Sequence, residues 1–269
     1  MPCTLAIRSS NVLSLEISMK SFIEEKTELL NNGTIESLKL QIDGYQAHYL
    51  KAGTGSSVVL LHGGASDSGD WTETMSALSP YYSLYAPDII GYGKSDRNKN
   101  GYYLTEFVDF TLNFIQTLGL GSIALVGHSL GGRICLDIAL HHPYTVRRLA
   151  LVDTVGFGKL AWWGTVLGAA AWGFREALGR PQPYPRFLKE DTEDKDWRCL
   201  DKLTQLKVPT MLVWNRRDPY FSVNHAFRAK KILPEVRLEV FPGYGHAPHL
   251  KNREQFNNLL LDFLNHDQR

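Results

Sequence analysis

The chain has 269 residues, of which 43% are hydrophobic and 21% are charged, and its formal net charge at pH 7 is +1. This length and apolar content are enough for one substantial hydrophobic core. The near-neutral charge offers no excess to attract nucleic acid or anionic lipid, and no run of about 18 apolar residues predicts a membrane span. We therefore expect neither nucleic acid binding nor stable membrane insertion.

Residues 1–33 differ from the rest of the chain. Residues 21–30 have the pattern of a short amphipathic helix with Ser21 as its N-cap. The segment lacks the basic start, long apolar core and small-residue cleavage site of a secretory signal. We interpret residues 1–33 as an accessory arm, which could pack on the domain, cover a neighbouring subunit or remain mobile.

From residue 34 onward, strands and helices alternate in a doubly wound manner, which predicts a mostly parallel sheet. The turn Asp43-Gly44 joins the first two strands as an antiparallel pair. The expected strands are residues 38–42, 46–51, 57–61, 82–86, 122–126, 148–152, 208–214 and 237–241, and the expected helices are residues 71–78, a segment between Leu104 and Leu118, a segment from Ile134 onward, and one around residues 256–264.

The first loop of interest follows the strand at residues 57–61 and reads His62-Gly63-Gly64-Ala65. Its glycines allow backbone amides to approach a ligand closely. We predict that the N–H of Gly64 is one donor of an oxyanion hole and that the N–H of Leu130 is the other. His62 is interpreted as a residue that braces this loop.

The most informative motif is Gly127-His128-Ser129-Leu130-Gly131, between an apolar strand and an apolar-faced helix. A turn this tight requires glycine two positions before and two positions after the serine, because bulkier residues would clash. The following helix directs its N-terminal amides at an incoming negative charge. The motif therefore predicts that Ser129 is a nucleophile.

Residues 155–206 form an insertion between two predicted strands, and part of it, residues 160–174, is apolar nearly all round. Because a solvent-facing helix would carry a polar face, we expect the apolar surface of this segment to be covered by another part of the protein or by a ligand. We interpret it as a roof over the site whose pocket-lining candidates are Trp162, Trp163 and Trp172. It could instead pack on the core, and insertion into a lipid interface is disfavoured by the lack of a basic face.

Two further candidates follow strands nearer the C-terminus. Asp218 comes shortly after the strand at residues 208–214, and His246 follows the strand at residues 237–241. Serine, acid and histidine in this chain order, each at the carboxyl end of a strand, predict a catalytic triad in which His246 is the base and Asp218 the acid. Asp153, at the end of the strand preceding the insertion, is the rival for the acid role.

Taken together, these motifs resemble the α/β-hydrolase superfamily, specifically its cap-bearing serine hydrolases, which include esterases and meta-cleavage-product hydrolases. The resemblance runs from about Leu38 to Phe263. It implies a core of residues 34–154 and 207–269, with residues 155–206 as a short cap. The motifs are His62-Gly-Gly64, Asp88-x-x-Gly91-x-Gly93-x-Ser95-Asp96, Gly127-His-Ser129-Leu-Gly-Gly132, Asn215-Arg-Arg-Asp218-Pro219 and Gly245-His246.

Among the cap-bearing members of the superfamily, a serine nucleophile implies acyl chemistry, whereas epoxide hydrolases and haloalkane dehalogenases use aspartate. The function expected first is hydrolysis of a small, largely apolar carboxylic ester, with neither cofactor nor metal. Hydrolysis of a carbon–carbon bond, as in meta-cleavage hydrolases, is an alternative, although those enzymes usually have methionine where this chain has Leu130. A second alternative is that the chain is a small-molecule receptor with the same fold.

The three cysteines, Cys3, Cys135 and Cys199, do not have the spacing of metal ligands. A reducing compartment is their simplest setting, which favours the cytoplasm. The sequence does not indicate the physiological substrate or the oligomeric state.

Overall fold

The computed structural model describes residues 34–98, 102–162, 166, 169–170, 173–174, 177 and 199–265. The predicted accessory arm, residues 1–33, and most of the predicted cap, including Trp163 and Trp172, lie outside the described residues.

Eight strands of the described residues form one sheet in the order β1-β2-β4-β3-β5-β6-β7-β8. The pairings of β1 with β2 and of β2 with β4 are antiparallel, and every later pairing is parallel. This confirms the mostly parallel sheet and the antiparallel opening pair. The strands are β1 (Glu36–Ile42), β2 (Tyr45–Ala52), β3 (Ser56–Leu61), β4 (Tyr82–Pro87), β5 (Ile123–His128), β6 (Val146–Val152), β7 (Thr210–Arg217) and β8 (Arg237–Tyr244).

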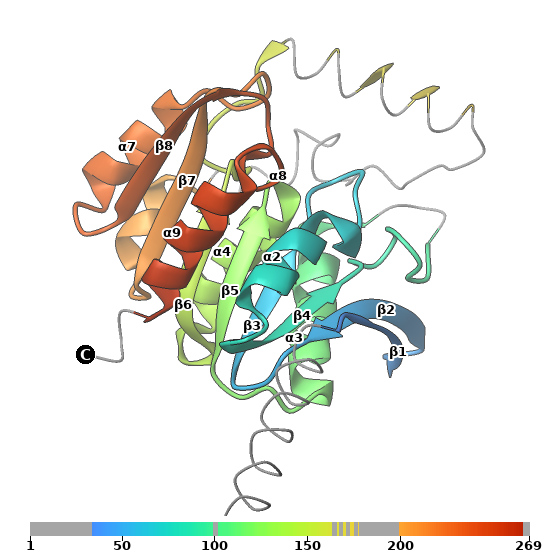
Figure 1. Cartoon of the computed structure of the whole chain (residues 1–269). Coiled ribbons are helices and arrows are strands. Elements are labelled where there is room, and N and C mark those ends of the chain that lie inside the picture. The colour runs from blue at the N-terminus through green and yellow to red at the C-terminus, as the bar shows by residue number, and fades with distance from the viewer. Residues whose placement is uncertain are drawn as a thin grey trace, which may run out of the picture.

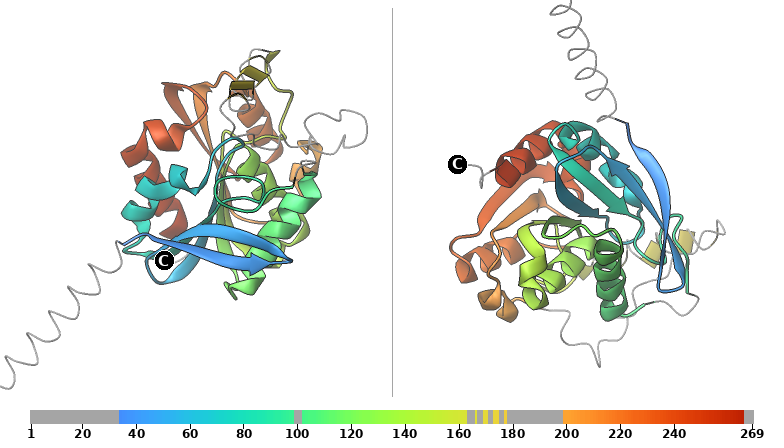
Figure 2. Two further views of the ribbon diagram at one scale, coloured as in Figure 1. Left: turned by 90° about the vertical axis from the view of Figure 1, so that its right-hand side faces the viewer. Right: turned by 90° about the horizontal axis from the view of Figure 1, so that it is seen from below.

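Helices cover both faces of the sheet, as the view from below in Figure 2 shows. One face carries α2 and α9, and the other carries α3, α4 and α7 (Figure 1). Each face has its own cluster of buried apolar side chains, so the sheet is the shared middle layer of the core. The helices are α2 (Thr72–Leu78), α3 (Leu104–Thr117), α4 (Leu130–His141), α7 (Asn224–Ile232), α8 (Pro248–Lys251) and α9 (Arg253–Asn265), with short 3-10 turns η1 (Ser68–Trp71), η2 (Pro143–Thr145) and η4 (Asp201–Gln205).

The central strand β5 is buried at all six of its positions. A parallel strand covered on both faces favours a continuous apolar run rather than alternation, and Ile-Ala-Leu-Val at the start of β5 fits that rule. The strand ends at His128, and α4 begins two residues later at Leu130. Ser129 therefore lies at the carboxyl edge of the middle of the sheet, where ligands bind in folds of this kind.

Some element boundaries differ from those expected. β7 continues to Arg217 and β8 to Tyr244, further than the sequence indicates, because Arg217 still pairs with Tyr244 across a register irregularity. α7 was not predicted at all. Its buried residues are Ala226 and Ala229, and Ile232 packs partly against the same core at helical spacing.

The described part of the insertion exposes apolar side chains. Trp162, one of the predicted pocket residues, is 64% exposed, and Phe174 is 67% exposed. Among the described residues, no helix has both the length and the apolar character needed to cross a bilayer.

Candidate active site

The turn between β5 and α4 holds Ser129 in a backbone conformation that is unusual for a residue other than glycine. Its φ is 51° and its ψ is −112°. The N–H of Ser129 donates to the carbonyl of Val152 at 2.9 Å, which fixes the turn to β6. A Cβ at Gly127 would collide with the backbone of Gly131, so the glycine expected at this position is required sterically.

The structure brings the three residues of the predicted triad together. Oγ of Ser129 donates to Nε2 of His246 at 2.8 Å, and Nδ1 of His246 donates to Oδ2 of Asp218 at 2.8 Å. The side chain of Asp218 is fully buried. Its other oxygen accepts from the backbone N–H groups of Tyr220 at 2.7 Å and Phe221 at 3.2 Å, so the carboxylate is held from both ends.

Aromatic rings flank the imidazole of His246. The ring of Tyr220 lies 4.9 Å from it and that of Phe221 lies 5.5 Å from it, measured between centroids. Such neighbours restrict both the rotation of the imidazole and the access of water to it. Together with the bond to Asp218, they orient Nε2 toward Ser129.

Asp153 lies close to this site but is bonded differently. It is fully buried, its Oδ1 accepts from the N–H of Asn215 at 2.9 Å, and its Oδ2 has no hydrogen-bond partner among the described residues. Burial and the nearby carboxylate of Asp218 raise its pKa well above the ordinary value of 3.8. Nδ1 of His246 donates to Asp218 and not to Asp153, so the geometry favours Asp218 as its partner.

The predicted oxyanion loop lies beside the start of α4. A Cβ added to Gly64 would lie 4.0 Å from the side chain of Leu130, so these two residues are neighbours. As the first residue of α4, Leu130 has an N–H without an acceptor within its own helix. The two predicted donors therefore lie near each other and near Ser129.

His62 braces this loop, as expected from the sequence. The buried ring donates from Nδ1 to the carbonyl of Gly63 at 2.7 Å and accepts at Nε2 from the N–H of Ile89 at 2.9 Å. Burial lowers its pKa, so the ring is neutral. With both nitrogens used, His62 is not placed to act as a base.

The neighbouring loop from Asp88 to Asp96 is tied to the same region. The buried carboxylate of Asp88 accepts from Nδ1 of His48 at 2.7 Å and from the N–H groups of Ser68 at 2.7 Å and Lys94 at 2.8 Å. Gly93 has a φ of 51°, and a Cβ there would collide with the Asp88 carboxylate. This motif therefore supports the His62 loop structurally.

Among the residues that the structure describes, two sets of side chains have donor atoms close enough together to hold a metal ion by distance alone. The first is Asp153, Asp218 and His246, but both ring nitrogens of His246 already form hydrogen bonds. The second is Asp70, His128 and His249, which sequence spacing did not indicate. Burial lowers the pKa of both histidines, that of His249 to about 3, so they are neutral.

Two surface cavities lie away from Ser129. One is between β6, β7 and α9, where Arg148, Val208 and Phe263 line it, and the other is beside α7, where Phe157 and His225 line it. Neither is lined by Ser129, Asp218 or His246, so neither is a candidate for the substrate pocket.

The sequence of this chain is similar to those of known proteins. The family model described as "alpha/beta hydrolase fold" matches residues 56–186. A 2-hydroxy-6-oxo-6-phenylhexa-2,4-dienoate hydrolase from Burkholderia cepacia is 25% identical over 88% of this chain and 99% of its own length.

Solved structures give the same fold. A meta-cleavage product hydrolase from Pseudomonas fluorescens superposes with a TM-score of 0.71 at 23% identity, covering 87% of this chain and 98% of that one. A carboxylesterase from Bacillus subtilis also has a TM-score of 0.71 at 23% identity, covering 93% and 98%. With the eight-stranded sheet and the serine turn at its carboxyl edge, these matches show that the chain has the α/β-hydrolase fold.

Proposed function

We propose that this chain is a serine hydrolase that cleaves a small, largely apolar carboxylic ester through an acyl-enzyme on Ser129. The observation that carries the proposal is the continuous hydrogen-bonded chain from Asp218 through His246 to Ser129, with both links at 2.8 Å. A serine hydroxyl is a weak nucleophile until an adjacent base accepts its proton, and this chain of contacts supplies such a base.

In this mechanism, Oγ of Ser129 attacks the ester carbonyl while Nε2 of His246 accepts its proton. The carbonyl oxygen becomes an oxyanion, which the N–H groups of Gly64 and Leu130 stabilise. His246 then returns the proton to the departing alcohol, and water repeats the sequence to release the acid. Asp218 orients the imidazole and stabilises its protonated form.

Burial supports the same assignment. Ser129 is 9% exposed and the side chain of Asp218 is fully buried, so charge that develops between them is poorly screened by water. An ester whose acyl group is apolar suits the exposed apolar residues of the insertion, including Trp162. Trp163 and Trp172 keep their proposed role as pocket residues.

Carbon–carbon bond hydrolysis is the second candidate, and one observation favours it. The matching relative from Burkholderia cepacia covers 88% of this chain and is named for a dienoate substrate of that kind. The same nucleophile and base would serve, so the two candidates differ in substrate.

The test is burst kinetics with short-chain p-nitrophenyl esters, together with mass spectrometry after treatment with a serine-directed phosphonate. We expect a burst of nitrophenol equal to the enzyme concentration or a steady ester turnover, and one label on Ser129. Ser129→Ala is the control and should give neither. Turnover of a ring-cleavage dienoate without ester turnover would favour the second candidate, and inactivity on both would favour a receptor.

We also propose that the protein is located in the cytoplasm. Cys135 and Cys199 are buried free thiols, which are typical of proteins in a reducing compartment.

A further inference from the structure

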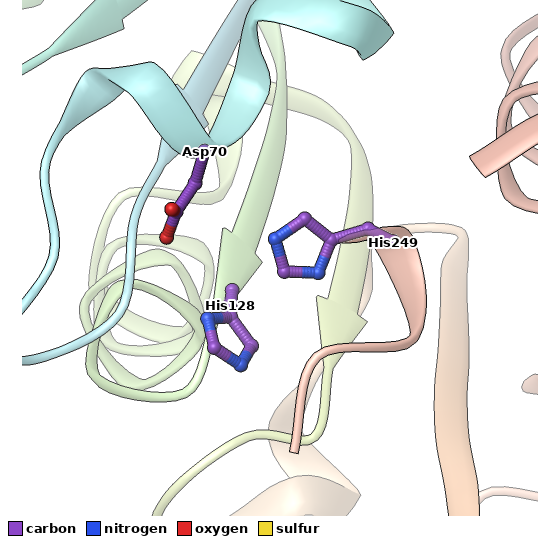
Figure 3. A group of neighbouring side chains, drawn as sticks. All are labelled: Asp70, His128 and His249. Atoms are coloured by element: carbon purple, nitrogen blue, oxygen red, sulfur yellow. The ribbon is translucent and has the colours of Figure 1, made fainter. Parts of the chain in front are cut away.

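Figure 3 shows a second cluster of acidic and imidazole side chains, one of which, His128, directly precedes Ser129 in the sequence. It joins Asp70 from η1, His128 from the end of β5 and His249 from α8. One potential ligand atom from each lies within 4.8 Å of the other two. His128 is 7% exposed and His249 is 1% exposed, so both imidazoles are almost entirely removed from water.

The hydrogen bonds of His128 determine which of its nitrogens is available. Nε2 donates to the carbonyl oxygen of His246, and a neutral imidazole has only one N–H. Nδ1 therefore carries a lone pair, and it has no hydrogen-bond partner among the described residues. Metal-binding histidines are commonly oriented in this way, with the outer nitrogen donating to a backbone carbonyl.

His249 contributes a second lone pair. Neither of its ring nitrogens has a hydrogen-bond partner in the described part of the chain. Its ring stacks on Trp71 at 4.4 Å with an interplanar angle of 25°, which holds the ring in place. Figure 3 shows the ring facing Asp70 and His128 across the gap between them. Unpaired nitrogens that are this deeply buried are rare in folded proteins, and they point to a ligand.

Asp70 completes the set with a negative charge. Its side chain is half-buried, and Oδ2 accepts a hydrogen bond from Oγ of Ser66. A carboxylate has about four acceptor sites, so one carboxylate can accept a hydrogen bond and bind a cation at the same time. Because Asp70 is the member of the cluster that reaches solvent, it also marks a route of entry.

We propose that Asp70, His128 and His249 bind one divalent transition-metal ion of the zinc class. Two neutral imidazoles and one carboxylate are a ligand set that Zn²⁺ accepts, with water as the fourth ligand. Bond lengths of about 2.0–2.2 Å place tetrahedral ligand atoms roughly 3.4 Å apart. The three side chains would therefore have to close by at most about 1.4 Å, which rotation about their side-chain bonds can supply.

The test measures binding directly, so it does not depend on the proposed esterase activity. The full-length chain is freed of metal with a chelator, and Co²⁺ is titrated as a spectroscopic substitute for Zn²⁺. We expect one equivalent of Co²⁺ to bind, with the intense visible absorption of a four-coordinate ion. Zn²⁺ should then abolish that absorption.

Two variants assign the site. His249→Ala removes a ligand and should weaken binding at least about a hundredfold. Asp70→Asn removes the charge with little change in shape, which keeps the test valid if His249→Ala fails to fold. The matched control is His141→Ala, because His141 pairs with Asp137 on the surface and offers a histidine–carboxylate pair outside the cluster.

The control variant should bind Co²⁺ as the natural chain does. Absence of saturable binding by the natural chain would overturn the proposal, as would an affinity unchanged in both His249→Ala and Asp70→Asn. A site whose cobalt spectrum is lost only in His141→Ala would also overturn it.

Discussion

Two carboxyl groups lie near His246, and their hydrogen bonds differ. Asp218 accepts hydrogen bonds from Nδ1 of His246 and from two backbone N–H groups. Asp153 accepts only the N–H of Asn215 at one oxygen and has its pKa raised by burial and by Asp218. We therefore expect Asp153 to keep its proton to a higher pH than an ordinary aspartate does.

The first prediction compares two substitutions that preserve shape. Asp218→Asn should lower kcat by about 10³–10⁴-fold, because the amide cannot hold the imidazole in the required tautomer or stabilise its protonated form. Asp153→Asn should change kcat by less than about tenfold, since an amide closely resembles a protonated carboxyl group. Steady-state kinetics on a p-nitrophenyl ester would measure both. Equal losses in the two variants would make Asp153 a functional acid as well.

The second prediction concerns stability against pH. The pKa of Asp153 is higher in the folded chain than the ordinary 3.8 of an unfolded one, so the folded state retains a proton that the unfolded state releases. This contribution to stability is complete below pH 3.8 and is lost as pH rises toward the folded pKa. Asp153→Asn removes the titrating carboxyl group and with it this part of the pH dependence of stability.

The variant should therefore gain stability over the natural chain as pH rises above 4, by up to about 1.4 kcal/mol per pH unit. Guanidinium unfolding at pH 4, 5, 6 and 7 would measure the difference. A difference that is constant over this range would contradict the raised pKa.

The residues that meet at Ser129 were predictable because each lies in a motif at the end of a strand, and parallel strands end at one edge of the sheet. The cluster of Asp70, His128 and His249 was not predictable. Its members lie on a 3-10 turn, a strand and a four-residue helix that are far apart in sequence, and no spacing relates them. The protonation of Asp153 likewise depends on burial, which the sequence does not state.

At the scale of elements, the junction of β5 and α4 is the most constrained part of the chain. Gly127 faces the backbone of Gly131, Gly131 faces the backbone of Leu61, and Gly132 faces Thr154, each without room for a Cβ. Three close approaches within six residues explain why the turn can be recognised from sequence. They also mean that the helix, the turn and the neighbouring strand β3 cannot shift independently.

The third prediction tests this junction. Gly127→Ala should cost about 3 kcal/mol or more in the free energy of unfolding, because the new Cβ meets backbone atoms that cannot move aside. Gly173→Ala is the matched control, since a Cβ at that helical position meets none of the described residues within 4 Å. The control should change stability by no more than about 1 kcal/mol, in the stabilising direction. Chemical denaturation would measure the free energy of unfolding of both variants. A similarly small change in both would show that the backbone at the junction can shift to accommodate the new Cβ.

Strand and helix types were predictable wherever burial leaves a clear apolar pattern in the sequence. Examples are the continuous apolar run of β5 and the apolar face of α9, which has helical spacing. Strand ends were less predictable, because β7 and β8 continue as far as they can pair with each other. α7 was not predicted, although Ala226, Ala229 and Ile232 lie at helical spacing on the side that packs against the core.

At the scale of the whole molecule, two cysteines report on the integrity of the core. Cys135 and Cys199 are both fully buried, and burial raises the pKa of each thiol. Because the thiolate is the reactive form, both groups should be unreactive while the chain is folded. Cys3 lies outside the described residues, so a Cys3→Ser variant isolates the two buried thiols.

The fourth prediction follows. The folded Cys3→Ser variant should release almost no thionitrobenzoate from Ellman's reagent, and the unfolded variant should release two equivalents. The rate of labelling in mild denaturant should then equal the rate at which the core opens. Rapid labelling of one thiol in the folded variant would show that the core around it opens locally.

Trp71 and Met75, from η1 and α2, share one buried cluster with Phe256 and Leu260 of α9. Thr74 donates to Oδ1 of Asn257 at 2.9 Å, a bond that spans 183 residues of sequence. During synthesis on the ribosome, this face of the nascent chain stays uncovered until α9 has emerged, which at about 5–20 residues per second takes on the order of ten seconds or more. For that interval the growing chain exposes an apolar surface to solvent, and we expect a chaperone to be needed to protect it from aggregation.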